Sequence, residues 1–309
     1  MIISIASGQF GNQLFQYLFC KKLVSERGKS EKIVLIGFQD IKKCFEDNCF
    51  QNTLFIKREN RFHRILLNRI LRNIIFKIVS KLKIISTCSI RKEIILEQFE
   101  RETTEYYTTN GLFKNIIYLP TFYAQSETFF NKEDAERLII KPKYRDQASE
   151  FTSLDHGKIK VFVHLRLGDY HHFTIMGKPT TLPISYFDQC CKEFEIKYKN
   201  KIVFYIFSNE KNLEKFNFIK QLSNYKVFSN DFFVDFALMT QCNGGVISAS
   251  SFSWWGSYFM KDKIEIFAPK YWLGFSSGID FQTQTTRKDM TLINIKEIEK
   301  KIFFCQNIL

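Results

Sequence analysis

The stretch GVISASSFSWWGSYF, from Gly245 to Phe259, indicates both the fold class and the place of a site. A short apolar strand, a turn of small residues (Ala249–Ser251) and a helix start follow one another in it. Free backbone N–H groups, hydroxyls and the positive end of a helix dipole meet at such a junction and favour an anion. The alternative interpretation is a serine-capped helix that packs Trp254 and Trp255 into a core.

A second stretch, KVFVHLRLGDY from Lys160 to Tyr170, has the same strand-to-turn form. Its apolar run suits a buried parallel strand and ends in His164, Arg166 and Asp169. Ligands of doubly wound sheets bind at the carboxyl ends of strands, and a bidentate arginine there suits a phosphate. The alternative is an Arg–Asp surface pair of little energetic value.

Strands and helices alternate along the chain, which is typical of an α/β protein with parallel sheets. The expected strands are 2–5, 33–36, 94–96, 116–119, 159–165, 202–208, 225–228, 246–248 and 264–268. The expected helices are 12–26, 131–138, 185–199, 212–222, 232–241 and one from Ser253. The polar, poorly periodic stretch 141–157 is where we expect the boundary between two domains, 1–150 and 151–309.

Several motifs occur in the order of one known family. An S-S-F-S-W-W-G run is present as Ser250–Gly256, an H-x-R-R-G-D-Y motif as His164–Tyr170, and a G-x-x-G-N-Q-x-F-Q opening as Gly8–Gln16. Shorter matches are Gln125–Glu127, Phe207–Ser208 and Asp235–Met239. Together they cover residues 8–272 and resemble the bacterial alpha-1,2-fucosyltransferases of glycosyltransferase family 11.

The chain departs from the family pattern at three places. Leu167 stands where the family has a second arginine, Ser7 precedes Gly8 in place of a glycine, and Asn209-Glu210 replaces a pair of aspartates. If the missing arginine contacts phosphate, one charge-assisted hydrogen bond is lost, a matter of donor affinity more than of reaction class.

The resemblance implies a GT-B-like fold, with two Rossmann-like domains facing a cleft. Domain 1–150 would take the acceptor and domain 151–309 would bind GDP-fucose. The implied activity is inverting, metal-independent transfer of L-fucose from GDP-fucose to the 2-hydroxyl of a galactoside, in the synthesis of bacterial O-antigen, lipopolysaccharide or capsule.

The resemblance also implies roles for residues. Arg166 would contact the donor diphosphate and Asp235 the guanine; each has an ordinary structural alternative, a surface pair or a helix-surface carboxylate. The expected donor-binding residues are Gly8, Gly11, Asn12, His164, Arg166, Ser208, Asp235, Ser250, Ser251, Phe252 and Ser253. The expected acceptor-binding residues are Tyr123, Gln125 and Glu127.

The identity of a catalytic base stays open in the sequence. Asp169, His171 and His172 are the choices, with Arg166, Asp169 and His172 forming the expected catalytic set. A strongly oxocarbenium-like transition state needs no base. The sequence has no Asp-x-Asp motif, and the adjacent histidines, expected to point apart on a strand, lack partners at ligand spacing, so no metal and no cofactor are expected.

The formal net charge is +13, which favours an anionic substrate, an anionic membrane surface or nucleic acid as partner. Nine basic residues lie between Lys57 and Lys83 against one acid, Glu59, in a pattern typical of a basic amphipathic helix. Such a helix either packs on its own domain or docks on the inner membrane, where a lipid-linked, galactose-terminated acceptor would sit. No nucleic-acid motif accompanies the charge, so we expect no nucleic acid as partner.

Scattered cysteines, no leader-like start and no apolar run of about 20 residues indicate a cytoplasmic protein, free or peripheral on the membrane. Two alternatives remain beside the fucosyltransferase: a transferase of the same fold with another nucleotide-sugar donor, and a non-catalytic basic protein that binds nucleic acid.

Overall fold

The computed structural model describes residues 1–28, 30–57, 74, 78, 81–96, 99–120, 122–210 and 212–306. Contacts divide the chain into two compact units. Unit 1 comprises Met1–Lys141 with Gln282–Thr285, and unit 2 comprises Pro142–Phe281 with Thr286–Leu309. The assignment of acceptor and donor to the two halves stays a prediction.

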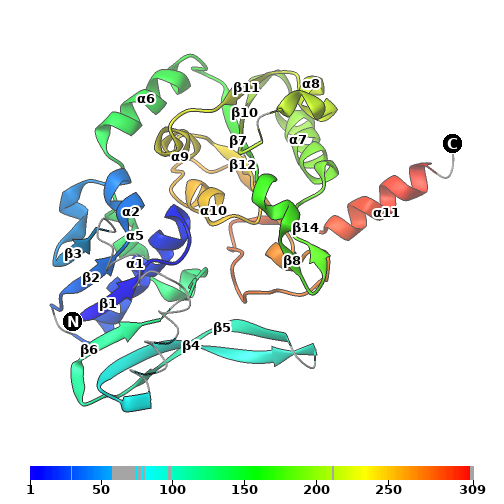
Figure 1. Ribbon diagram of the computed structural model, residues 1–309. Helices are drawn as coiled ribbons and strands as arrows, with labels where there is room; N and C mark the ends of the chain where they lie inside the picture. The colour runs from blue at the N-terminus through cyan, green and yellow to red at the C-terminus, as the bar shows by residue number, and fades with distance from the viewer. Residues whose placement is uncertain are drawn as a thin grey trace. The chain divides into compact units, whose positions relative to one another are not determined.

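Unit 1 is built on a six-stranded sheet of order β3-β2-β1-β6-β4-β5 (Figure 1). The strands pair in parallel except β5, which runs antiparallel to β4 at one edge. The strands are β1 (Ile2–Ile5), β2 (Ile33–Ile36), β3 (Thr53–Ile56), β4 (Ile85–Ile95), β5 (Phe99–Thr109) and β6 (Phe113–Leu119). The helices are α1 (Phe10–Glu26), α2 (Gln39–Cys44), α5 (Lys132–Glu136) and the 3-10 helices η1 (Asp47–Phe50) and η3 (Glu127–Phe129).

Helix α1 is the centre of the unit 1 core. It is apolar nearly all round rather than on one stripe, and its buried side chains include Leu14, Phe15, Leu18 and Phe19. A helix with this pattern must be covered on several sides. The ring of Phe19 meets those of Phe122 and Phe129 edge-on, at centroid distances of 5.2 and 5.3 Å.

Unit 2 is built on a six-stranded, all-parallel sheet of order β11-β10-β7-β12-β13-β14. Its strands are β7 (Ile159–Leu165), β10 (Ile202–Ser208), β11 (Tyr225–Phe228), β12 (Gly244–Val246), β13 (Glu265–Pro269) and β14 (Thr291–Ile293), with a small hairpin of β8 (Thr174–Ile175) and β9 (Lys178–Pro179). Its helices are α6 (Pro142–Ser153), α7 (Ile184–Tyr198), α8 (Asn217–Gln221), α9 (Phe232–Thr240), α10 (Ser251–Tyr258), α11 (Ile295–Gln306) and the 3-10 helices η4 (Gly168–His172), η5 (Lys199–Lys201), η6 (Leu213–Lys215) and η7 (Trp272–Gly274).

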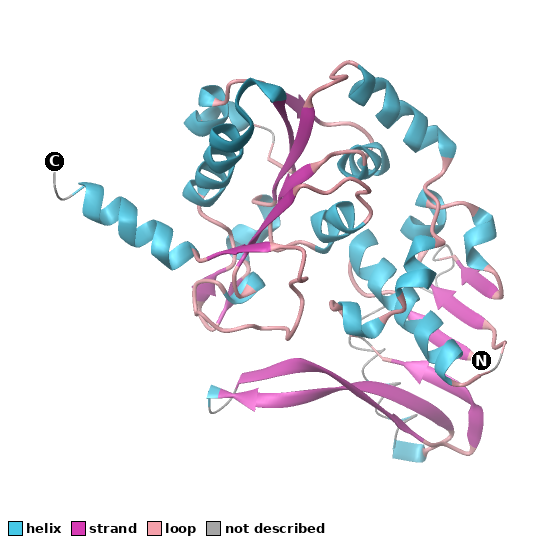
Figure 2. Cartoon of the chain, turned by 180° about the vertical axis from the view of Figure 1, so that it is seen from behind, coloured by secondary structure: helices cyan, strands magenta, loops and turns pink. Residues whose placement is uncertain are grey.

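Helices cover both faces of the unit 2 sheet, with α7 on one side and α9 and α10 on the other (Figures 1 and 2). Val161, Val163 and Leu165 of β7 join the α7-side core, whereas Phe162 contributes to the opposite face. Both faces are apolar because a parallel sheet covered on two sides has no solvent-facing positions. This explains the continuous apolar run in the sequence and confirms the expectation of two parallel α/β halves.

The expected linker 141–157 is mostly helix α6, which belongs to unit 2. Only Tyr144 and Ala148, one turn apart, are buried on it, and the Tyr144 ring lies 5.1 Å from that of Phe233. An apolar stripe this narrow is hard to recognise in the sequence.

The ribbon of β4 and β5 was largely missed, because only residues 94–96 were expected to be a strand. From Arg91 onward β4 is largely exposed, and cross-strand ion pairs with β5 replace an apolar pattern there: Arg91 with Glu105, Lys92 with Glu100 and Arg101 with Glu93. The expected helix 212–222 is also wrong in extent, since only the short α8 and η6 form there.

Most of the basic helix expected between Lys57 and Lys83 falls on residues 58–73, 75–77 and 79–80, outside the described residues. In the part of the chain that is described, no helix has the length and apolar character needed to cross a bilayer.

Candidate active site

The carboxyl ends of β7 and β12, neighbours in the unit 2 sheet, are joined by Ser248. Its hydroxyl donates to the His164 carbonyl at 2.6 Å and accepts from the backbone N–H of Arg166 at 3.0 Å. Ser248 is buried, so these bonds fix the backbone at the point where β7 ends.

Arg166 stands at this strand end with its guanidinium 5.6 Å from the centre of the Tyr170 ring. The Tyr170 hydroxyl in turn donates to the Ala249 carbonyl at 3.0 Å. The turn that carries the arginine is therefore tied to the turn that opens α10.

Asn209 is a site residue that sequence reasoning noted only as a departure from the family. Its side-chain oxygen accepts the backbone N–H of Leu167 at 3.1 Å. A Cβ on Gly168 would lie 2.5 Å from the Asn209 side-chain nitrogen, so a larger residue there would displace the Asn209 side chain. Asn209 thus holds the arginine turn from the end of β10.

Leu167, at the position of the family's second arginine, packs in the core. Its side chain is 2% exposed and belongs to the core beside Leu165, Leu182 and Tyr186. The Leu167 side chain anchors the turn in the apolar core. Arg166 is the one arginine of the motif in this chain.

Several serine hydroxyls of the α10 junction are engaged with the backbone. The Ser250 hydroxyl caps the helix by accepting the Phe252 N–H at 3.4 Å, and the buried Ser253 hydroxyl lies 3.3 Å from the carbonyls of both Ser248 and Ser250. What remains for an anion is the first-turn N–H groups other than that of Phe252, and the half-buried Ser251.

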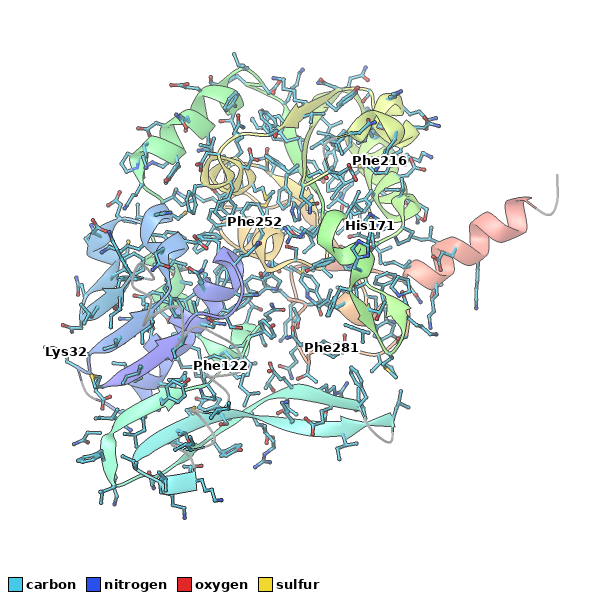
Figure 3. The ribbon with its side chains drawn as sticks, in the orientation of Figure 1. Lys32, Phe122, His171, Phe216, Phe252 and Phe281 are labelled. Carbon is cyan, nitrogen blue, oxygen red and sulfur yellow. The ribbon has the colours of Figure 1, made fainter. Side chains whose placement is uncertain are left out.

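His164, Phe252 and Phe232 form an aromatic cluster beside this junction; Figure 3 labels Phe252 on α10. The Phe252 ring stacks on Phe232 at 5.1 Å and lies 5.6 Å from the His164 ring. Sequence reasoning missed Phe232, which is 39% exposed. Apolar runs in the sequence carry no signal for such a half-covered aromatic.

The imidazole of His164 is only 5% exposed, and its Nδ1 has no partner within the described ranges. Burial, together with the neighbouring Arg166 charge, lowers the pKa of His164 to about 3. The ring is therefore neutral at pH 7 and keeps an unused polar atom.

Ser208 is the last residue of β10, and Asp235 lies in the first turn of α9. The Ser208 hydroxyl donates to the Leu165 carbonyl at 2.9 Å, and Asp235 accepts from the Asn230 side chain at 3.0 Å. Burial raises the pKa of Asp235, with Asn230 opposing the rise. One Asp235 oxygen thus binds Asn230 on the protein's own loop.

The stretch expected to be a strand at His171 and His172 is instead the 3-10 helix η4, on which both histidines are exposed. Figure 3 labels His171 there. Asp169 lies on the same turn, and its side chain is outside the described part of the chain.

In unit 1 the motif Gly8–Gln16 forms the turn after β1 and the first turns of α1. Gly8 has φ of +81°, and a Cβ there would lie 2.1 Å from the Asn12 side-chain nitrogen, so glycine is required. Gly11 is buried within α1. The Gln16 amide donates to the carbonyls of Ser7 and Phe122 at 2.9 and 2.8 Å, which locks the turn to the loop after β6.

The structure brings Asn12 and Gln125 together, with the Gln125 amide donating to the Asn12 oxygen at 2.7 Å. Tyr123, from the same loop, is 36% exposed, and Glu127 is exposed at the start of η3. Among the described residues, no three His, Cys, Asp or Glu side chains are grouped so as to hold a metal ion.

The sequence of this chain is similar to those of known proteins. Residues 1–276 match the sequence profile described as "Glycosyl transferase family 11". An alpha-1,2-colitosyltransferase of Escherichia coli is 26% identical over 88% of this chain and 92% of its own. The O-antigen biosynthesis glycosyltransferase WbnK of Escherichia coli is 24% identical over 87% of this chain and 94% of its own.

Among solved structures, POFUT1 in complex with GDP is similar in fold, with a TM-score of 0.50 at 12% identity, covering 86% of this chain and 96% of that one. The likeness supports the GT-B-like class, which the alternating strands and helices of both units permit. The profile match extends over most of the 309 residues and includes the arginine turn, the α10 junction and the Gly8 turn. The chain belongs to glycosyl transferase family 11.

Proposed function

We propose that this chain transfers L-fucose from GDP-fucose to the 2-hydroxyl of a galactoside, with inversion at the anomeric carbon and without a metal ion. The observation that carries the proposal is the fixed position of Arg166. Ser248 and Asn209 hold its turn beside the α10 N-terminus, at neighbouring strand ends.

Charge develops on the leaving diphosphate of the donor as the sugar departs. Arg166 and the N–H groups of the first α10 turn, with Ser251, stabilise that charge without reorganising. The adjoining aromatic cluster offers Phe232 and Phe252 for stacking on guanine, and Asp235 accepts N–H groups of the guanine edge. Neutral His164, Ser208, Gly8, Gly11 and Asn12 complete the proposed donor contacts.

The proton of the acceptor hydroxyl goes to a base or to solvent. Asp169 and His172 are the proposed bases, since η4 follows Arg166 directly and His172 is exposed on it. Tyr123, Gln125 and Glu127 are the proposed acceptor contacts, the aromatic and amide groups suiting a sugar.

The relative named for O-antigen biosynthesis supports a role in bacterial surface-glycan synthesis. The acceptor is then a galactose-terminated glycan, free or lipid-linked, met by a cytoplasmic enzyme that is free or peripheral on the inner membrane.

A second candidate function is transfer of colitose from GDP-colitose, supported by the relative named as an alpha-1,2-colitosyltransferase. Colitose is L-fucose without its 3-hydroxyl. A site that hydrogen-bonds this hydroxyl discriminates strongly against the deoxy sugar, whereas an apolar pocket discriminates weakly against the hydroxyl.

The test is transfer from GDP-fucose, GDP-colitose and GDP-mannose to a panel of galactose-terminated oligosaccharides. Products are followed by mass spectrometry, and the linkage and anomeric configuration by NMR. A higher kcat/KM with GDP-fucose and a 1,2-linked α-L-fucosyl product support the first function. Preference for GDP-colitose supports the second, and no transfer from any GDP-sugar contradicts both.

A further inference from the structure

Glu102 occupies an irregular point of the β4–β5 ribbon in unit 1. It pairs with Lys92 directly after the register shifts between Ile90 and Lys92. The Thr103 hydroxyl donates to the Arg91 carbonyl at 3.1 Å and fills the shift. Irregularities of this kind turn a side chain away from the regular alternation and are frequent beside active sites.

Glu102 differs from its acidic neighbours on the ribbon. Glu93, Glu100 and Glu105 each form an ion pair with a cation on the opposite strand. The Glu102 carboxylate instead lies near the backbone of Tyr123, which favours its charged form. Burial raises the pKa of Glu102, and the Lys92 charge and the Tyr123 N–H offset only part of the rise. This carboxylate is therefore partly desolvated, and no cation of the described residues forms an ion pair with it.

Gln282 lies beside it. The segment Gln282–Thr285 belongs to unit 1, and Gln282 forms a parallel bridge with Glu102 while the Thr283 N–H and hydroxyl donate to the Glu102 carbonyl, each at 3.4 Å. The Gln282 side chain is 8% exposed, and its oxygen has no hydrogen-bond partner in the described part of the chain. A buried amide oxygen without a partner is costly, which points to a donor supplied by a ligand.

The loop that carries Tyr123, whose backbone lies near the Glu102 carboxylate, has an uncommon conformation at Ala124. Ala124 is 1% exposed and has φ of +50°, a region that alanine rarely adopts. Its neighbours are half-exposed Tyr123 and Gln125, the latter bound to Asn12. The loop follows β6 and begins near Phe122, labelled in Figure 3. Such strain persists where the surrounding structure holds it, often at ligand sites.

We propose that Glu102 and Gln282 form a subsite for the acceptor sugar, in which their side-chain oxygens accept hydrogen bonds from ring hydroxyls while Tyr123 packs against the sugar face. Two adjacent acceptors and one aromatic ring suit a neutral hexose. The Glu102 charge disfavours an anionic ligand, and Lys92 on the facing strand disfavours a metal cation. The subsite rests on the proposed function, because a galactoside is its occupant.

Gln282 lies beyond residue 276, where the family match ends. The subsite therefore makes a segment outside the matched range a determinant of acceptor choice within the family.

The test uses the full chain with lactose as the acceptor probe. Glu102→Gln should raise the acceptor KM about 10- to 150-fold, as loss of a charge-assisted hydrogen bond does. The Kd for GDP, measured by titration calorimetry, should stay within twofold. Glu105→Gln is the matched control, since Glu105 lies on the same strand in an exposed ion pair with Arg91, and its acceptor KM should not change.

Gln282→Met separates binding from folding. It removes a buried oxygen that has no partner, so Tm should be unchanged or higher, while acceptor KM rises about 2- to 10-fold, the effect of one neutral hydrogen bond. The lactose saturation-transfer NMR signal, recorded with GDP present, should weaken in both variants, a readout independent of turnover.

An acceptor KM within twofold of wild type in Glu102→Gln overturns the subsite. If Glu102→Gln unfolds, Gln282→Met decides: unchanged acceptor KM and NMR signal overturn the subsite, and weakened ones support it. Wild type that transfers no sugar to any galactoside contradicts the proposed function instead, and that outcome is seen before any variant is made.

Discussion

The Ser248 hydroxyl accepts the backbone N–H of Arg166 at 3.0 Å, across the boundary between β12 and β7. The same hydroxyl donates to the carbonyl of His164, so one buried side chain spans the residues on both sides of the strand end. The backbone of Arg166 is therefore held in place by a buried hydrogen bond. A charge held in place stabilises a developing anion without the cost of reorganisation.

Arg166→Ala should lower the rate of sugar transfer by about two to three orders of magnitude, the usual effect of losing one transition-state contact. Transfer of labelled fucose measures it, with circular dichroism as the check on folding. Arg145→Ala is the control, since Arg145 is exposed on α6 in the same unit. Turnover within threefold of wild type in a folded Arg166→Ala protein would remove Arg166 from the mechanism.

Transfer should continue in excess EDTA, because protein groups are proposed to stabilise the leaving diphosphate. The rate is measured with and without chelator and again after adding manganese. Chelator-sensitive transfer that manganese restores would show that a metal ion takes part.

Stability should fall below pH 6.5 because of His164. Its pKa is about 3 in the folded chain against an ordinary value of 6.5, so the unfolded chain binds the proton first as pH falls. The free energy of unfolding then drops by up to about 1.4 kcal/mol per pH unit between those values. Urea denaturation at pH 7, 6 and 5 measures the slope.

The slope should flatten in His164→Gln and remain in His171→Gln, since His171 is exposed. Parallel stability curves for wild type and His164→Gln would contradict the assignment.

Arg287→Met should destabilise unit 2 by about 2–4 kcal/mol, the range for breaking a buried charged network. Arg287 is 4% exposed and donates to the Trp254 carbonyl at 3.0 Å and the Ser257 hydroxyl at 3.1 Å. It also pairs with Asp289 and lies 4.6 Å from the centre of the Trp254 ring. Urea denaturation gives the change, and Lys288→Met, next to it in the chain, is the control; equal stability of both variants would mean that Arg287 does not hold α10.

The segment Lys57–Lys83 should bind anionic vesicles, and salt should weaken the binding by screening. Replacing Arg61, Arg64, Arg69 and Arg72 with Gln should release the protein from sedimenting vesicles while turnover on a soluble acceptor stays the same. Wild type that fails to sediment with anionic vesicles even at low salt would show that the segment is not a membrane contact.

The sequence by itself determined the fold class, the family and the two turns of the candidate site. Runs such as Val161–Val163 must be buried on both faces, and Gly8 marks a turn with positive φ, so periodicity and glycine suffice to find them. Helix α6 was not predicted because only two of its residues are buried, which leaves little apolar periodicity in the sequence. The β4–β5 ribbon was largely missed because ion pairs, rather than alternating apolar residues, join its strands.

Only the tertiary structure decided which polar groups meet. Asn12 and Gln125 are 113 residues apart in the chain, and Glu102 meets Gln282 through a strand pairing that no local pattern encodes. It also showed Leu167 packed in the core and the serines of the α10 junction engaged with the backbone. Local sequence reports a residue's preference for burial and backbone conformation, whereas its hydrogen-bond partner depends on the packing of distant segments.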